Sequence, residues 1–108
     1  MAERKIDEKI ITAVERFVAE LSKHYRIEAA YLFGSFAKGT NHADSDIDVA
    51  VIASDITNTF DAMGKMWGYT WNFDTRIEPH PIRTEEFKKR ETPFINEIIS
   101  TGIPVYAV

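Results

Sequence analysis

The first half of the chain changes from a helical to a strand-like spacing of apolar residues. Six apolar residues recur on one predicted helix face among charged neighbours, at Ile6, Ile10, Val14, Phe17, Val18 and Leu21. Their spacing predicts a helix with one buried side. Residues 27–33 and 46–52 are short apolar runs, the second rich in β-branched side chains, and both are typical of strands. Residues 34–45 are polar and turn-like, so we expect a loop between the strands.

The second half begins with a weaker helical pattern and a third strand. Residues 57–69 carry apolar side chains at a helical period, although two glycines weaken this prediction. Residues 75–82 predict a strand. Its second half should lie at a sheet edge or leave the sheet, because Pro79 and Pro81 have no N–H group to donate.

Helix-terminal residues divide the last segment. Thr84 can cap a short helix, and Thr92-Pro93 can open another that Gly102 ends. Residues 103–108 then predict a last strand. The order of elements favours an α/β (α+β) fold, in which helices pack on a small mixed sheet. We expect it to form one domain over residues 1–108.

Composition narrows the class of protein. The 108 residues are 44% hydrophobic, carry a net charge of −4 and include no cysteine. The missing cysteine excludes a disulfide scaffold, thiol catalysis and cysteine-based zinc sites. No apolar run approaches the roughly 18 residues of a membrane span, and the N-terminus does not resemble a signal peptide, so we expect a cytoplasmic protein. The acidic balance argues against strong non-specific nucleic-acid binding but not against a nucleotide bound through metal.

Three polar features carry candidate chemistry. Asp46 and Asp48 share one face of the second predicted strand, and paired carboxylates suit a hard cation such as Mg²⁺. Glu78 can complete a three-carboxylate cluster if its strand lies beside theirs. Gly34-Ser35 follows the first strand and can offer backbone N–H groups and a hydroxyl to a phosphate. Taken alone, each feature has a plainer interpretation as a solvated strand end, an exposed edge residue or a turn.

Together these features resemble the signature of the polymerase-β-like nucleotidyltransferases. In that signature Gly-Ser is followed after about ten residues by Asp-x-Asp and by a third carboxylate on a later strand. Here ten residues separate Ser35 from Asp46. The end of the chain is similar as well, so the resemblance covers nearly the whole length. The size is similar to that of the minimal nucleotidyltransferases, and the resemblance implies their fold.

The resemblance also implies the reaction and its residues. The implied catalytic and metal-binding residues are Asp46, Asp48 and Glu78, and the implied nucleotide-binding residues are Gly34, Ser35 and Lys38. One or two Mg²⁺ ions would act in transferring a nucleoside monophosphate, AMP from ATP, to a hydroxyl group. Lys38 stands where the family usually has Arg, and Glu78 stands where Asp is commoner.

The resemblance also implies a protein partner, and two other functions are alternatives to the enzyme described above. Minimal nucleotidyltransferases often pair with a small helical HEPN protein in toxin–antitoxin modules, which implies a HEPN-type partner with an acceptor tyrosine. The chain could instead be a non-catalytic antitoxin that neutralises a helical partner by binding it. A small-molecule (antibiotic) nucleotidyltransferase is a further alternative. Such enzymes use an extra substrate domain that this chain is too short to carry, so homo-oligomerisation would have to replace it. The clustered carboxylates favour the enzyme, because binding alone does not require them.

Two further groups of side chains could take part in binding. His80 shares the face of Glu78 and could touch the metal site or an acceptor, although such a histidine is more often a polar edge residue. Trp67, Tyr69 and Trp71 lie close together in the sequence and could stack on an adenine. We expect contacts with the core or a partner instead.

Overall fold

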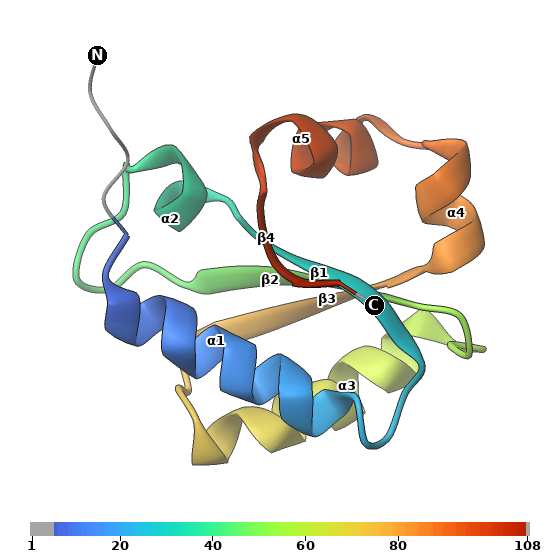
Figure 1. Ribbon diagram of the computed structural model, residues 1–108, viewed down its shortest axis with the longest axis horizontal. Coiled ribbons are helices and arrows are strands. Elements are labelled where there is room, and N and C mark those ends of the chain that lie inside the picture. The colour runs from blue at the N-terminus through green and yellow to red at the C-terminus, as the bar shows by residue number, and fades with distance from the viewer. Residues whose placement is uncertain (1–5, 108) are drawn as a thin grey trace.

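A four-stranded sheet, in the order β3-β2-β1-β4, runs through the centre of the molecule (Figure 1). The computed structural model describes residues 6–107. Residues 1–5 of the predicted domain and Val108, the end of the predicted last strand, lie outside them. The strands are β1 (Ile27–Phe33), β2 (Ile47–Ala53), β3 (Ile77–Arg83) and β4 (Ile103–Ala107). β1 is antiparallel to β2 and β4, whereas β2 and β3 are parallel, so the sheet is mixed, as predicted.

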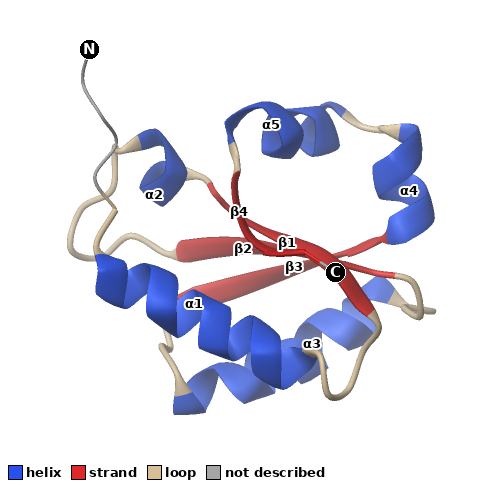
Figure 2. Ribbon diagram, in the orientation of Figure 1, coloured by secondary structure: helices blue, strands red, loops and turns tan. Residues whose placement is uncertain are grey.

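Helices pack on both sides of the sheet (Figure 2). They are α1 (Glu8–Leu21), α2 (Ser35–Lys38), α3 (Thr59–Tyr69), α4 (Thr84–Lys89) and α5 (Pro93–Thr101), with a short 3-10 helix η1 (Thr70–Asn72) after α3. α1 and α3 lie on one side of the sheet, and α4 and α5 lie on the other (Figure 1). Among the described residues, no helix is both long and apolar enough to cross a membrane.

Side-chain caps determine where two of the helices begin. The Asp7 carboxylate accepts the N–H of Lys9 at 2.9 Å, so α1 begins after Asp7 and the predicted helix residue Ile6 precedes it. The Thr92 hydroxyl accepts the N–H of Ile95 at 3.2 Å and starts α5 in the same way. Each cap satisfies an N–H group that has no partner within the first turn.

The helix α2 is the main departure from the predicted elements, because it lies within the expected loop 34–45. Phe36 and Ala37 are buried there, and Gly39 ends the turn with a φ of 74°. Four residues are too few to show a helical period, so the pattern of the sequence could not predict this turn. The 3-10 helix η1 is a second element that the pattern does not predict. Thr84 is the first residue of α4 and not its cap, because its hydroxyl donates to Glu28 Oε2 at 3.0 Å. The other differences are shifts of an element's end by one or two residues, as at β2, which begins at Ile47 and not at Asp46.

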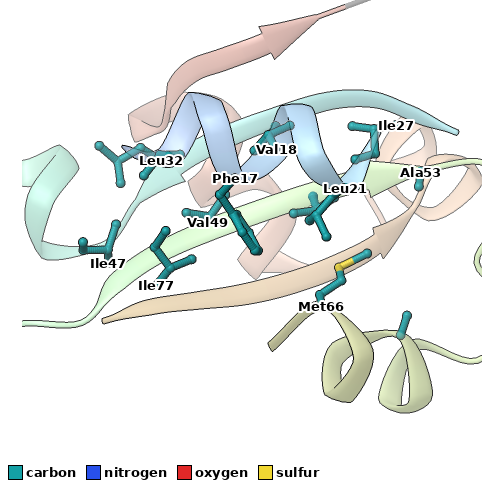
Figure 3. Close-up of a cluster of buried hydrophobic side chains, with 14 of the residues drawn as sticks. Phe17, Val18, Leu21, Ile27, Leu32, Ile47, Val49, Ala53, Met66 and Ile77 are labelled. Carbon is teal, nitrogen blue, oxygen red and sulfur yellow. The ribbon is translucent and has the colours of Figure 1, made fainter. Parts of the chain in front are cut away.

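The two faces of β2 belong to different hydrophobic clusters. Residues buried toward α1 and α3 include Phe17, Leu21, Ile47, Val49, Met66 and Ile77 (Figure 3). The smaller cluster on the α5 side includes Phe33, Ala50, Ile52, Ile82, Ile95 and Ile98. Because side chains alternate along a strand, Asp48 shares the α5 side of β2 with Ala50 and Ile52. The sheet therefore presents this carboxylate on the face that carries α5.

The strand β3 lies at the edge of the sheet, as its prolines predict. The carbonyl oxygen of Arg76 accepts the N–H of Ile47 at 2.9 Å, so the backbone of Arg76 faces β2. Alternate residues of a strand direct their backbone groups to the same side, so Glu78 faces β2 as well. Pro79 and Pro81 therefore face the free edge, where a missing N–H removes no hydrogen bond from the ladder.

Candidate active site

The pairing of three strands places the predicted site residues in one row. Asp48 of β2 lies opposite Phe33, the last residue of β1, and opposite Glu78 of β3. Gly34 follows Phe33 directly and so reaches the same end of the sheet. His80 is two residues beyond Glu78 and shares its face. One carboxylate therefore has a glycine turn on one flank and a second carboxylate with a histidine on the other.

Asp48, Glu78 and His80 form a compact group of potential metal ligands. One ligand atom from each lies within 4.8 Å of the others, and no other group of three or more such residues occurs within residues 6–107. The His80 Nε2 is 3.2 Å from Asp48 Oδ1 and 3.9 Å from Glu78 Oε1. All three side chains are partly buried, so water only partly screens their charges.

Asp46 lies next to this group but is not one of its three members. It is exposed and directly before β2, and its carboxyl is close enough to help raise the pKa of Glu78. The structure thus brings Asp48 and Glu78 together as the sequence predicts, with Asp46 at the margin. It adds His80, for which an ordinary edge residue was the commoner interpretation of the sequence.

The carboxyl of Glu78 has a pKa above its usual value. Burial is the largest cause, because it disfavours the charged form. The negative charges of Asp48 and Asp46 act in the same direction, whereas His80 opposes them. Converging carboxylates of this kind repel one another unless a cation lies between them.

The donor set suits a divalent cation. Two or three carboxylate groups supply the hard oxygen ligands that Mg²⁺ and Mn²⁺ accept, and an imidazole nitrogen is a ligand for Mn²⁺ and other transition metals. Asp48 and Glu78 could hold such a cation, with Asp46 beside them, and His80 belongs to the same group of ligand atoms.

Gly34 brings the chain against Asp48 in a conformation that favours glycine. Its φ is 75°, and a Cβ at this position would collide with the Oδ2 atom of Asp48. A residue with a side chain would therefore be strained and would displace the carboxylate. The short helix α2 starts at the next residue, Ser35, which is partly buried. The backbone of the Gly-Ser turn thus lies directly against the Asp48 carboxylate.

Lys38, at the end of α2, is engaged elsewhere. Its ammonium forms an ion pair with Glu97 Oε1 of α5 at 2.7 Å, and both side chains are about half exposed. This pair links α2 to α5. Lys38 would have to exchange Glu97 for a phosphate in order to act as the sequence predicts.

Two aromatic side chains that the sequence did not single out stand beside the ligand group. The rings of Phe33 and His80 are 5.0 Å apart and meet edge to face, and Phe94 of α5 lies 5.4 Å from Phe33 and 6.0 Å from His80. Phe94 remains 41% exposed. The only sequence signal was position, because Phe33 precedes Gly34 and Phe94 follows the helix-opening proline.

The aromatic cluster after residue 66 is not a core cluster. Trp67 and Trp71 are exposed, and only Tyr69 packs partly against the core, where it stacks on His24 with ring centroids 4.7 Å apart. These residues belong to α3 and η1, on the side of the sheet opposite Asp48. Their exposure excludes the core for the two tryptophans, and the other part of the expectation, contact with a partner, stays a prediction.

A mixed sheet with acidic side chains from two neighbouring strands beside a Gly-Ser turn defines the nucleotidyltransferase class. The comparison with known families agrees. Residues 15–107 match the family model described as Polymerase beta, Nucleotidyltransferase, and the chain belongs to this family.

One relative is similar in sequence over a short segment, and solved structures are similar in fold over most of the chain. A 30-residue segment is 53% identical to the protein adenylyltransferase MntA of Shewanella oneidensis, and this match spans 28% of the chain and 22% of MntA. A crystal structure of a candidate nucleotidyltransferase from Sulfolobus solfataricus superposes with a TM-score of 0.65 at 20% identity, covering 88% of this chain and 78% of that one. A toxin–antitoxin structure with AMP-PNP gives 0.56 at 21% identity, with coverages of 87% and 73%. At these identities the structures establish the fold.

Proposed function

We propose that this protein transfers AMP from ATP to a hydroxyl group on another molecule. The observation that carries the proposal is the position of Asp48, which lies between the Gly34 turn on one flank and Glu78 on the other. A triphosphate bound at the turn and a hydroxyl bound near Glu78 would meet at this carboxylate. The short identical segment shared with an adenylyltransferase supports AMP as the group transferred.

The proposed reaction is an in-line displacement at the α-phosphorus of ATP. The acceptor oxygen forms a bond to that phosphorus, while the bond from the phosphorus to the oxygen bridging to the β-phosphate breaks. Pyrophosphate leaves with the bridging oxygen. The hydroxyl proton passes to Glu78, which lies opposite Asp48 on the flank away from the Gly34 turn, and then to water.

The remaining predicted residues would bind and orient the nucleotide. Gly34 and Ser35 would donate N–H and O–H groups to the β- and γ-phosphates, and Lys38 would add a positive charge. Mg²⁺ held by Asp46, Asp48 and Glu78 would neutralise charge on the triphosphate. This division leaves the flank of Glu78 and His80 for the acceptor.

The acceptor we propose is a tyrosine of a small helical HEPN-type partner, in the cytoplasm, with the chain acting as antitoxin. The support is the similarity in fold to a toxin–antitoxin structure with AMP-PNP and the resemblance of the motif to minimal nucleotidyltransferases. The exposed aromatic side chain of Phe94 beside the site is consistent with a protein acceptor, because exposed aromatic residues are common at interfaces.

The test is a transfer assay with ATP labelled at the α-phosphate. The protein, Mg²⁺ and a HEPN-type partner encoded beside it are mixed, and the labelled residue is mapped by mass spectrometry. We expect label on a tyrosine of the partner. Asp48→Asn should lower transfer by more than the roughly 10–100-fold loss typical of an outer-shell group. Asp61→Asn, an exposed carboxylate on α3, is the matched control and should transfer normally.

Two outcomes would contradict the proposal. Full transfer by Asp48→Asn would exclude the role given to the carboxylates. A tight complex without label, under conditions in which ATP binds, would instead favour the non-catalytic antitoxin.

A further inference from the structure

A pocket opens at the free edge of β3, at His80. It has a volume of about 250 Å³. Phe60 and Met63 of α3 line it from one side of the sheet, Phe94 lines it from the other, and His80 and Ile82 lie between them. The pocket therefore lies around the edge strand, between α3 and α5.

The pocket is suited to a single apolar side chain. Its volume is below the roughly 300–1,000 Å³ of pockets that hold whole small molecules. Phe60 is 85% exposed and Phe94 is 41% exposed, so two aromatic rings at the rim present apolar surface to water. An aromatic side chain bound there would cover them, and burial of such surface is favourable.

The inner end of the pocket is polar. His80 lines the pocket and also belongs to the ligand group, with its Nε2 3.2 Å from Asp48 Oδ1 and 3.9 Å from Glu78 Oε1. A side chain that enters from the apolar rim thus meets His80, whose ring adjoins both carboxylates. Tyrosine combines an apolar ring with a polar tip, whereas serine lacks the ring and phenylalanine lacks the hydroxyl.

The position of the pocket separates it from the turn proposed for the phosphates. Gly34 follows β1, whereas the pocket lies beyond β3, so Asp48 of the intervening strand β2 stands between them. We propose that this pocket receives the ring of the acceptor tyrosine and directs the tyrosine hydroxyl past His80 to Asp48 and Glu78. This inference rests on the proposed function. Phe60, Met63 and Phe94 then determine which acceptor is used.

The test uses N-acetyl-L-tyrosinamide as the probe, with N-acetyl-L-serinamide and adenosine as comparisons. Methyl resonances of Met63 and Ile82 are followed by NMR in the labelled protein, with Mg²⁺ present. We expect tyrosinamide to shift both resonances at millimolar concentration, and serinamide to leave them in place. Phe60→Ser, at an exposed position, should weaken this binding about fivefold or more.

The matched control is Trp71→Ser, which removes another strongly exposed aromatic residue outside the pocket. It should leave tyrosinamide binding unchanged. With the HEPN-type partner as acceptor, Phe60→Ser should lower transfer to the partner, while the melting temperature still rises with ATP and Mg²⁺ as in the wild type.

The outcomes distinguish this inference from the proposed function. Shifts caused by adenosine in preference to tyrosinamide would assign the pocket to a nucleobase and overturn the inference, and so would unshifted resonances with every probe. A melting temperature that responds to ATP and Mg²⁺ without any tyrosinamide binding would contradict the inference alone. Tyrosinamide binding without any response to ATP would contradict the proposed function alone.

Discussion

Ile47 donates its backbone N–H to the carbonyl oxygen of Arg76 at 2.9 Å, and this hydrogen bond sets the register of β2 against β3. From this point the parallel strands pair residue for residue, so Asp48 lies opposite Glu78. A shift of one residue would turn Glu78 to the opposite face of the sheet. The site therefore depends on the short turn that positions Arg76.

Asp74 holds this turn in place. Its carboxylate accepts the backbone N–H of Arg76 at 2.9 Å and two guanidinium N–H groups at 3.1 and 2.8 Å. These hydrogen bonds, chiefly those from the guanidinium, hold the pKa of Asp74 below its usual value. A lowered folded-state pKa contributes stability that is present above the unfolded pKa and lost as the pH falls through the folded pKa.

We therefore predict that Asp74→Asn lowers the free energy of unfolding by about 1 kcal/mol at neutral pH. The difference from the wild type should shrink as the pH falls below about 4, where the carboxyl of the unfolded chain takes up a proton, and further as it falls through the lower pKa of the folded state. Urea unfolding of both proteins at pH 7 and pH 3 measures this difference in the free energy of unfolding. Glu91→Gln, an exposed loop position, serves as control, and an equal difference at both pH values would contradict the electrostatic explanation.

Gly34→Ala tests the close approach of the glycine turn to Asp48. The new Cβ would push the Asp48 carboxylate out of the ligand group, and the φ of 75° would add strain of about 1–3 kcal/mol. We expect a lower melting temperature and weaker binding of ATP with Mg²⁺, measured by titration calorimetry. Gly64→Ala, where a Cβ meets nothing within 4 Å in α3, should leave binding intact and not lower stability.

Glu78→Gln should have opposite effects on the free and the liganded protein. With a chelator present, removing one of the crowded carboxylates relieves repulsion and the cost of burying a charge, so the melting temperature should rise. With saturating ATP and Mg²⁺, at about 100 times the dissociation constant, the wild type should gain about 2.7 kcal/mol, or roughly ten degrees. The variant should gain much less.

Thermal melts with each ligand alone and with both provide the measurement for Glu78→Gln. Glu91→Gln should behave as the wild type in every condition. If Glu78→Gln lowered the melting temperature of the free protein, the carboxylate would be stabilising and the crowding described here would be wrong.

The ion pair between Lys38 and Glu97 predicts a competition with phosphate. Glu97→Gln releases the ammonium from its 2.7 Å contact, so ATP should bind about two- to fivefold more tightly, and Lys38→Ala should weaken binding. The comparable exposed pair of Lys89 and Glu85 is the control, and Glu85→Gln should change nothing. Calorimetric titration with ATP measures the affinities. Unchanged affinity in both Lys38 and Glu97 variants would exclude Lys38 from the nucleotide site.

Much of the fold could be predicted because its elements carry strong local patterns. The helical stripe ending at Leu21 and the β-branched run after Asp46 form the elements expected, and the prolines at 79 and 81 predicted the edge position of β3. The turn α2 could not be predicted, because it is too short for a helical period and the burial of Phe36 and Ala37 is a tertiary effect.

Some residues of the candidate site could likewise be predicted from the sequence, whereas others are placed by tertiary packing. The spacing of Gly34, Asp46 and Asp48 could be read along the chain, and Glu78 needed only the assumption that its strand lies beside β2. Phe94 could not be found, because its place beside His80 depends on how α5 packs across the sheet. The side chain of Lys38 could not be placed either, since its ion pair joins residues 59 positions apart.

The prolines of β3 also limit how another polypeptide can reach the site. An incoming strand extends a sheet by hydrogen-bonding to the N–H and C=O groups of its edge, and at Pro79 and Pro81 those N–H groups do not exist. Neither a second copy of the chain nor an extended peptide can therefore continue this sheet at β3. A protein that approaches the carboxylates from this side has to present a helix or loop and make its contacts through side chains.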